Sequence, residues 1–198
     1  MDRARETHRR GRPGRAGARP LAALVRDRRG ATAVEFAMLA FPFFALFCVI
    51  VQSGVQLLAQ QTLDMSVERA ARLLRTGEFQ DAADGSDPAT RMRKVLCGSA
   101  LVFFRCGDLK LDVTRAGSFS QSQVVPAYDG KKKDWASGFG SHFDCPVGDD
   151  VVSLRVAVPV LGPFRLLDFG AQPMGGGQQL LTATSIFRSE PYTGKTCS

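Results

Sequence analysis

Ser141, His142 and Asp144 are residue types that hydrolytic enzymes use, and they stand close together in the sequence. A serine nucleophile needs a histidine as its base, and that histidine needs a carboxylate that orients it. Sequence neighbours rarely adopt this geometry, and no nucleophile-elbow motif surrounds Ser141. The sequence therefore predicts no catalytic residues, and we expect a protein that is not an enzyme.

Metal-ligating residues are equally sparse. The only histidines are His8 and His142, and no two cysteines have the C-x-x-C spacing of a zinc site. His8 lies in an arginine-rich arm, so the two histidines cannot share a site within one folded domain. We expect no metal and no cofactor.

Cysteines are the remaining reactive side chains. Cys48 lies inside a long apolar run, where a thiol behaves as a small apolar group. The other four, Cys97, Cys106, Cys145 and Cys197, would form disulfides in an oxidising compartment and allow three pairings. We favour Cys97 with Cys106, because this bond links the end of a predicted helix to the start of the next strand. The remaining bond, Cys145 with Cys197, has no positional argument of its own.

An uncharged stretch from Phe36 to Ala59 is the element around which the chain is organised. As a helix it would extend about 36 Å, enough to cross the roughly 30 Å hydrocarbon core of a bilayer. No small-x-small cleavage site of a secretory signal follows it at residues 57–61. We therefore predict a membrane span that is retained.

Arginines dominate the residues before this span. Residues 1–30 hold ten arginines and three acidic residues, and Arg26, Arg28 and Arg29 adjoin the apolar run. By the positive-inside rule, the N-terminus is cytoplasmic and the C-terminal domain is periplasmic. The 16 basic and 16 acidic residues of 31–198 cancel, so the net charge of +7 comes from the arm. Because a nucleic-acid surface needs its cations on the folded domain, we expect no nucleic-acid partner.

The segment RRGATAVEF, residues 28–36, joins basic residues, a glycine, small or apolar residues, a glutamate and an aromatic residue. This pattern resembles the processing site of type IV prepilins. GATAVEF, followed by QQTLD at 60–64 and ERAAR at 68–72, resembles the TadE family of tight-adherence pilus assembly proteins, which are minor pseudopilins. The resemblance is strong over residues 28–76. It extends more loosely through Cys97, Cys106, residues 109–113 and the C-terminal LLTATSIFRSEPY.

The resemblance implies cleavage after Gly30 by a prepilin peptidase, which would make Ala31 the new N-terminus. Glu35 would then be the fifth residue, followed by Phe36, and its carboxylate would pair with the terminal amine of a neighbouring subunit. The implied partners are the membrane, the prepilin peptidase, other pilins or pseudopilins, and the pilus assembly platform. The implied location is the bacterial inner membrane, crossed once, or the pilus itself.

Two functions from different classes remain open at this point. The first is a non-enzymatic, pseudopilin-like component of a tight-adherence (Flp-type IV) pilus assembly system, processed after Gly30. The second is an uncleaved, bitopic envelope protein whose periplasmic domain binds another partner. A mature N-terminus at residue 31 would indicate the first function, and one at residue 1 or 2 the second.

Hydrophobic periodicity predicts one continuous helix from Thr32 to Thr76, ended by Gly77. Beyond the span this helix is amphipathic, and its apolar face is formed by residues three or four positions apart: Ala59, Leu63, Val67, Ala70 and Leu74. Half of the helix would thus be an anchor, and half would carry a contact face.

The rest of the chain predicts a small α+β domain. Residues 77–88 have the composition of a linker that ends in a helix start, Asp87 followed by Pro88. A second helix would cover about 89–104, with Met92, Val95, Leu96 and either Val102 or Phe103 facing inward. Alternating residues predict strands at 109–113, with Asp112 outward, at 152–158 and at 178–188.

Helices followed by antiparallel strands indicate the α+β class, with an antiparallel sheet after a second helix. We expect three parts: a basic cytoplasmic arm (1–30), a long pilin-like helix (31–76, transmembrane at about 36–59) and an exported α+β domain (77–198).

Overall fold

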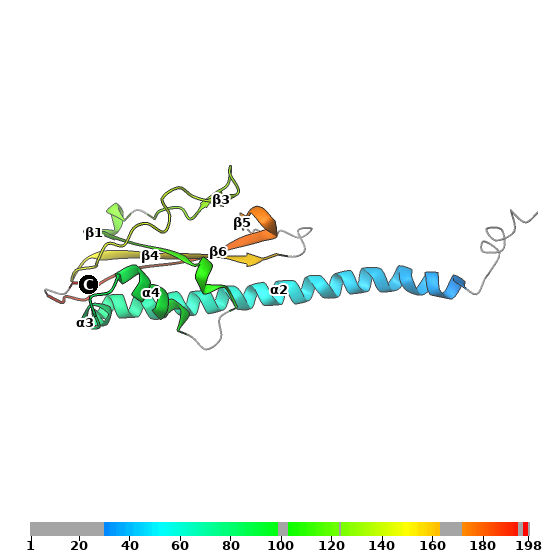
Figure 1. Cartoon of the computed structure of the whole chain (residues 1–198), viewed down its shortest axis with the longest axis horizontal. Helices are drawn as coiled ribbons and strands as arrows, with labels where there is room; N and C mark the ends of the chain where they lie inside the picture. The colour runs from blue at the N-terminus through cyan, green and yellow to red at the C-terminus, as the bar shows by residue number, and fades with distance from the viewer. Residues whose placement is uncertain (1–29, 99–102, 123, 163–171, 194–195, 198) are drawn as a thin grey trace, which may run out of the picture. The chain divides into compact units, whose positions relative to one another are not determined.

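The computed structural model describes residues 30–98, 103–122, 124–162, 172–193 and 196–197 (Figure 1). The chain forms two compact units, residues 1–46 and residues 47–198. A 46-residue helix, α2 (Ala31–Thr76), contributes to both and continues without interruption through Pro42. The single long helix expected from the sequence is therefore present.

The C-terminal part of α2 carries the apolar face that the residue spacing predicted. Its members are at most 2% exposed: Ala59, Leu63, Val67, Ala70 and Leu74. Each buried leucine or valine contributes about 1.5–3 kcal/mol, so this face attaches the helix to the domain. The helix stops before Gly77, whose φ of 78° lies in the left-handed region that favours glycine. A Cβ at this position would also lie 3.0 Å from the Tyr192 ring.

A short helix, α3 (Glu78–Asp81), follows directly, so the prediction of a linker over residues 77–88 is wrong for its first part. Phe79 and Gln80 are both buried, at 3% exposed. The Gln80 side chain donates to Tyr192 Oη at 2.9 Å and to the carbonyl oxygen of Pro146 at 3.2 Å. These contacts with distant parts of the chain fold a segment whose composition is mostly polar.

The second long helix, α4 (Pro88–Cys97), begins where it was expected. Asp87 caps it by accepting a hydrogen bond from the backbone N–H of Thr90 at 2.8 Å, and Pro88 occupies the first helical position. The helix ends at Cys97, before Gly98, so its predicted extension to Phe104 is wrong. Met92 and Leu96 are fully buried, Phe103 is 46% exposed, and Val102 lies outside the described residues.

A four-stranded antiparallel sheet completes the domain, with strand order β1-β4-β6-β5. Its strands are β1 (Lys110–Ala116), β4 (Val151–Leu161), β5 (Gln172–Pro173) and β6 (Gln178–Arg188). β4 and β6 pair along their full length, from Val151 opposite Arg188 to Leu161 opposite Gln178. A separate hairpin joins β2 (Tyr128–Asp129) to β3 (Asp134–Trp135). Among the described residues, short 3-10 turns lie between these elements: η2 (Cys106–Asp108), η3 (Phe119–Gln121) and η5 (Gly175–Gly177). The α+β class is thereby confirmed.

Both faces of the sheet are covered (Figure 1). On one face, residues of β1, β4 and β6 share the main core with the apolar face of α2 and with α3 and α4. On the other face, Ala157 and Leu180 pack with Ala127, Phe139 and Met174 in a smaller core. Asp112 therefore does not face solvent as expected. It is 2% exposed, and its Oδ1 accepts hydrogen bonds from the backbone N–H groups of Gly140 and His142.

Candidate functional site

Gly30 directly precedes α2, which starts at Ala31. Among the described residues, nothing lies within 4 Å of a Cβ built on Gly30, and its φ is not in the left-handed region. Gly77 differs on both counts, because its φ is positive and a Cβ would meet Tyr192. The fold therefore needs glycine at position 77 and makes no such demand at position 30.

Glu35 is the fifth residue of α2 and is exposed. The helix dipole stabilises an anion only within the first turn, and the first turn of α2 contains no acidic residue. The Glu35 carboxylate follows that turn. Positions 31 and 35 lie on the same face of the helix, since residues four apart are neighbours. No described side chain forms an ion pair with Glu35. Phe36, which follows it, is 71% exposed.

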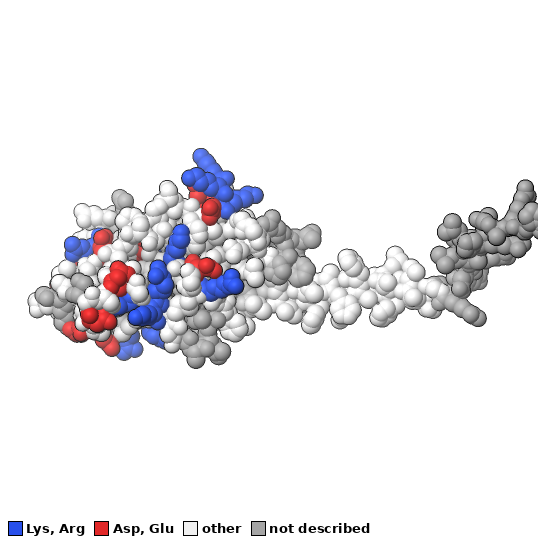
Figure 2. Space-filling view, in the orientation of Figure 1, with Lys and Arg blue, Asp and Glu red and all other residues white. Residues whose placement is uncertain are grey.

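The first half of α2 exposes large apolar side chains over many turns. Phe36, Leu39, Phe41 and Phe43 are 64–78% exposed, and the pattern continues to Leu57 at 61%. The most apolar window of 18 residues has a mean hydropathy of 2.4 and buries none of its residues. On the face shown in Figure 2, Lys, Arg, Asp and Glu side chains lie on the domain, whereas other residues cover the exposed part of α2. By length and composition this helix indicates a single-pass membrane protein. Arg26, Arg28 and Arg29 lie outside the described residues.

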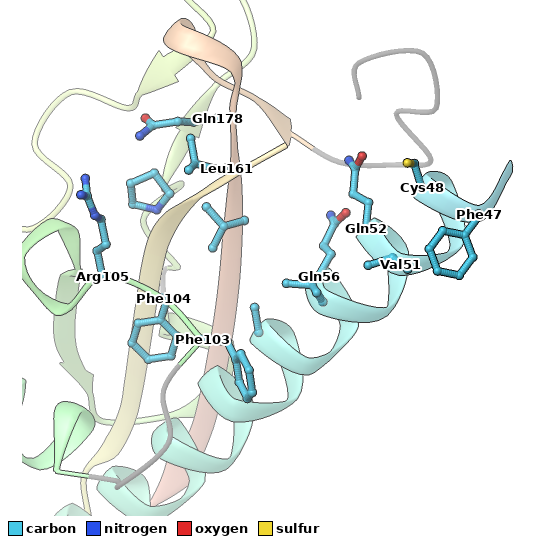
Figure 3. A pocket seen from close by; sticks show the side chains of 14 residues that line it. Phe47, Cys48, Val51, Gln52, Gln56, Phe103, Phe104, Arg105, Leu161 and Gln178 are labelled. Atoms are coloured by element: carbon cyan, nitrogen blue, oxygen red, sulfur yellow. The ribbon is translucent and has the colours of Figure 1, made fainter. Parts of the chain in front are cut away.

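A groove of about 670 Å³ lies within the unit formed by residues 47–198 (Figure 3). One wall is the part of α2 from Phe47 to Ala59. The other walls are residues 103–105, the end of β4 at residues 159–161, and Gln178. We name this the α2 groove. Figure 3 shows Gln52 and Gln56 extending from the helix toward the side of Leu161, with Phe103 beside the helix.

Sequence reasoning missed the α2 groove, although one signal was present. Cys48, Gln52, Gln56 and Ala59 recur at spacings of four, four and three, and so continue the buried face of α2 toward its N-terminus. Leu161 at the end of β4 is 79% exposed and contributes apolar surface to the groove. Nothing local in the sequence brings this strand end opposite the helix.

The four domain cysteines form two disulfide bonds, Cys97 with Cys106 and Cys145 with Cys197. This is the pairing that the sequence analysis favoured. Their Cα atoms are 6.1 Å and 5.7 Å apart, within the usual range for a disulfide. Cys48 is free and half-buried in the wall of the α2 groove.

Arg91 is a second feature that sequence reasoning missed. Only 9% of its side chain is exposed, and it donates to the carbonyl oxygens of Phe79, Ala82 and Cys197 at 2.6–2.8 Å. Its guanidinium carbon lies 4.5 Å from the centre of the Phe79 ring. Asp84 Oδ1 is 3.5 Å from Nε, and Ser86 and Arg91 together lower the pKa of that carboxyl, Ser86 contributing more. The available signal was helical spacing, because Arg91 lies four residues before Val95, which was predicted to face inward.

The group around His142 does not have the geometry of a triad. Ser141 Oγ and Asp112 Oδ1 lie 3.3 Å and 3.7 Å from the same ring atom, Nδ1 of His142, whereas a relay requires both ring nitrogens. The Ser141 hydroxyl donates to the carbonyl oxygen of Gly138, and the backbone N–H of Asp144 donates to that of Val113. Within the described residues, no three His, Cys, Asp or Glu side chains are grouped as metal ligands.

Part of the chain matches a known protein family. Residues 30–72 match the family described as TadE-like protein. The match begins at Gly30 and includes Glu35, the exposed apolar part of α2 and most of its buried face. It implies a component associated with a tight-adherence pilus and with the membrane. No curated protein and no solved structure matches the chain.

Proposed function

We propose that this chain, with its TadE-like segment at residues 30–72, is a non-enzymatic, pseudopilin-like component of a tight-adherence pilus assembly system. In this proposal a prepilin peptidase cleaves after Gly30, and Ala31 becomes the N-terminus of the mature protein. The observation that carries it is Gly30, which stands one residue before α2 although the fold does not require glycine there. The fold does not constrain which residue stands at position 30, and this position begins the family match. A glycine there suits recognition by another protein.

Glu35 acts after cleavage in this proposal. The new ammonium group of Ala31 and the carboxylate of Glu35 would both lie near the lipid boundary, where each charge alone is costly. Pairing between the amine of one subunit and the carboxylate of the next would remove both costs and fix their axial register. The exposure of Glu35 and Phe36 leaves this face of the helix accessible to a neighbour.

The proposal places residues 1–30 in the cytoplasm, residues 31–76 in one pilin-like helix and residues 77–198 in the periplasm. It relies on Arg26, Arg28 and Arg29, which flank the apolar run in the sequence. The two disulfides agree with an oxidising compartment. A reporter that is active only in the periplasm should be active when fused after Ser198 and inactive when fused before Arg26.

The N-terminal residue of the protein purified from membranes tests the proposal directly. Mass spectrometry should find Ala31 in the wild type, and Gly30→Val should retain the full-length precursor because the peptidase pocket accepts no side chain there. Gly54→Val is the matched control, since Gly54 also has open space around its Cβ and should leave processing intact.

A wild-type N-terminus at residue 1 or 2, in a strain with a working pilus system, would reject processing. It would favour the uncleaved, bitopic envelope protein whose domain binds another partner. Normal processing of Gly30→Val would reject the role assigned to Gly30.

A further inference from the structure

The α2 groove combines an apolar floor with polar groups at its edges. Phe47, Val51 and Phe104 supply apolar surface, and Gln56, Gln178 and Arg105 supply two amides and a guanidinium. Phe103 and Leu161, at its rim, are 46% and 79% exposed. Such a surface suits an amphiphile, whose chains contact the apolar part and whose ester and phosphate groups accept hydrogen bonds from the amides and the guanidinium.

The length of the helix places this groove at a membrane boundary. The uncharged run from Phe36 to Ala59 extends about 36 Å, whereas the hydrocarbon core is about 30 Å thick. If the core starts after Glu35, about 20 residues cross it, and Gln56 to Ala59 then lie at the level of the lipid head groups. The helix wall of the groove therefore runs from acyl chains near Phe47 to head groups near Ala59.

The opposite wall faces the same stretch of helix. Leu161 and residues 103–105 line the groove together with helix residues 47–59, and Figure 3 shows Phe103 nearer to Gln56 than to Phe47. Phe103 and Leu161 are exposed, and contact with lipid would remove their apolar surface from water. Arg105, exposed on the same wall, can extend its charged end to the phosphates while its stem contacts apolar groups.

We propose that lipid from the surrounding leaflet fills the α2 groove, with Leu161 against acyl chains, Phe103 at the level of the head groups and Arg105 beside lipid phosphates. The domain is then partly embedded at its α2-groove end instead of standing clear of the membrane. This inference rests on the membrane span in the proposed function but goes beyond it, since neither cleavage nor pilus assembly requires a lipid-filled groove.

Tryptophan quenching by brominated lipid tests the occupant. The chain has one tryptophan, Trp135, which is changed to Phe so that a new tryptophan can report from Leu161→Trp. The full chain is placed, one copy per nanodisc, in phosphatidylethanolamine and phosphatidylglycerol with bromine near the glycerol end of the acyl chains. Leu161→Trp should lose most of its emission, and Ile186→Trp should lose little. Ile186 is the matched control. It is 44% exposed and lies near the end of β6 opposite to Gln178, the residue that pairs with Leu161.

A tryptophan within the membrane span distinguishes failure of the proposed span from failure of the groove inference. Phe44→Trp, at an exposed position of α2, should be quenched by bromine near the methyl end of the chains. If neither Phe44→Trp nor Leu161→Trp is quenched, both the proposed membrane span and the lipid-filled groove are overturned. Quenching at Phe44→Trp, with Leu161→Trp no more affected than Ile186→Trp, would overturn the groove inference alone. Burial of Leu161→Trp only in nanodiscs that hold two copies would assign the groove to a second subunit and also overturn it.

The phosphate contact has its own test. Arg105→Glu should reduce the quenching of Leu161→Trp, because the new carboxylate is repelled by lipid phosphates. Arg188→Glu is the control, because Arg188 lies at the end of β6 opposite to the groove residue Gln178. This change should leave the quenching unchanged. Equal quenching in both variants would remove Arg105 from the proposal.

Discussion

Arg91 Nη1 donates a hydrogen bond to the carbonyl oxygen of Cys197 at 2.8 Å, which connects α4 with the C-terminal segment of the chain. The other guanidinium nitrogens hold α3 and the residues after it, through Phe79, Ala82 and Asp84. One buried side chain thus connects α4 with α3 and the residues after it, and with the C-terminal segment. These three segments share no regular secondary structure.

Replacing Arg91 with methionine should destabilise the domain by about 3 kcal/mol, because several buried carbonyl groups lose their donor. Urea unfolding of the full chain in detergent, followed by Trp135 fluorescence, measures this loss. Lys94→Met on the exposed side of α4 is the control and should change stability by about 0.5 kcal/mol or less. Equal stability of both variants would show that Arg91 is not a structural connector.

The two disulfides should contribute unequally. Their cysteines are separated by 52 and 9 positions, and a longer closed loop restricts the unfolded chain more. Replacing Cys145 and Cys197 with alanine should cost about 4 kcal/mol, against about 3 kcal/mol for the other pair. Non-reducing peptide mapping identifies the bonds, and urea unfolding under oxidising conditions ranks them. A larger loss from the pair Cys97 and Cys106 would contradict the loop argument.

Acid should weaken the cap of α4. The Thr90 hydroxyl, followed by the Thr90 backbone N–H, lowers the pKa of Asp87 below its usual 3.8. The carboxylate therefore stabilises the folded chain above this usual value, and its contribution is lost as the pH falls through the lower, folded pKa. Thr90→Val should bring the pKa back toward 3.8, and Asp87→Asn should flatten the acid limb of the stability curve. Thermal unfolding between neutral and strongly acidic pH measures both, and an unchanged acid limb in Asp87→Asn would refute the assignment.

Glu35→Gln should separate assembly from processing. The variant keeps the shape of the side chain and loses its charge, so it should still be cleaved after Gly30 but enter the pilus machinery poorly. Cross-linking to pilus components and the mass of the N-terminus measure the two steps. Glu68→Gln, on an exposed part of α2 within the domain, should affect neither step. Normal recruitment of Glu35→Gln would leave Glu35 without a role in subunit pairing.

The elements that the sequence predicted well are those with a strong repeating signal. α2 has an apolar run followed by a clear helical face, and β6 was placed from Gln178 to Arg188 because its residues alternate between apolar and polar. Asp87 and Pro88 marked the start of α4 through capping chemistry that is entirely local. The end of α4 was placed too late because Leu101 to Phe104 continue the apolar pattern beyond Gly98.

The features that escaped prediction depend on contacts between distant residues. β2, β3 and β5 have only two residues each, too few for any periodicity. Asp112 is buried because residues 140–144 run beside β1, where Gly140 and His142 donate to its carboxylate and Phe143 pairs with Val113. Nothing near Asp112 in the sequence predicts this contact. The lining of the α2 groove combines residues near 50, 104 and 160, so it exists only in the folded chain.

The end of α2 also sets the order in which the protein can mature. Its last turn is completed by residues far along the sequence. The backbone N–H of Glu190 donates to the carbonyl oxygen of Arg75, and Tyr192 Oη, 118 positions after Leu74, donates to the carbonyl oxygen of Leu74. The apolar face of the same helix packs in one core with Leu181, Ala183 and Phe187 of β6. Residue 192 must therefore be translated before the end of this helix can be completely covered. Until β6 is made, the apolar face of α2 from Ala59 to Leu74 lacks its contacts with Leu181, Ala183 and Phe187 and is exposed to other proteins.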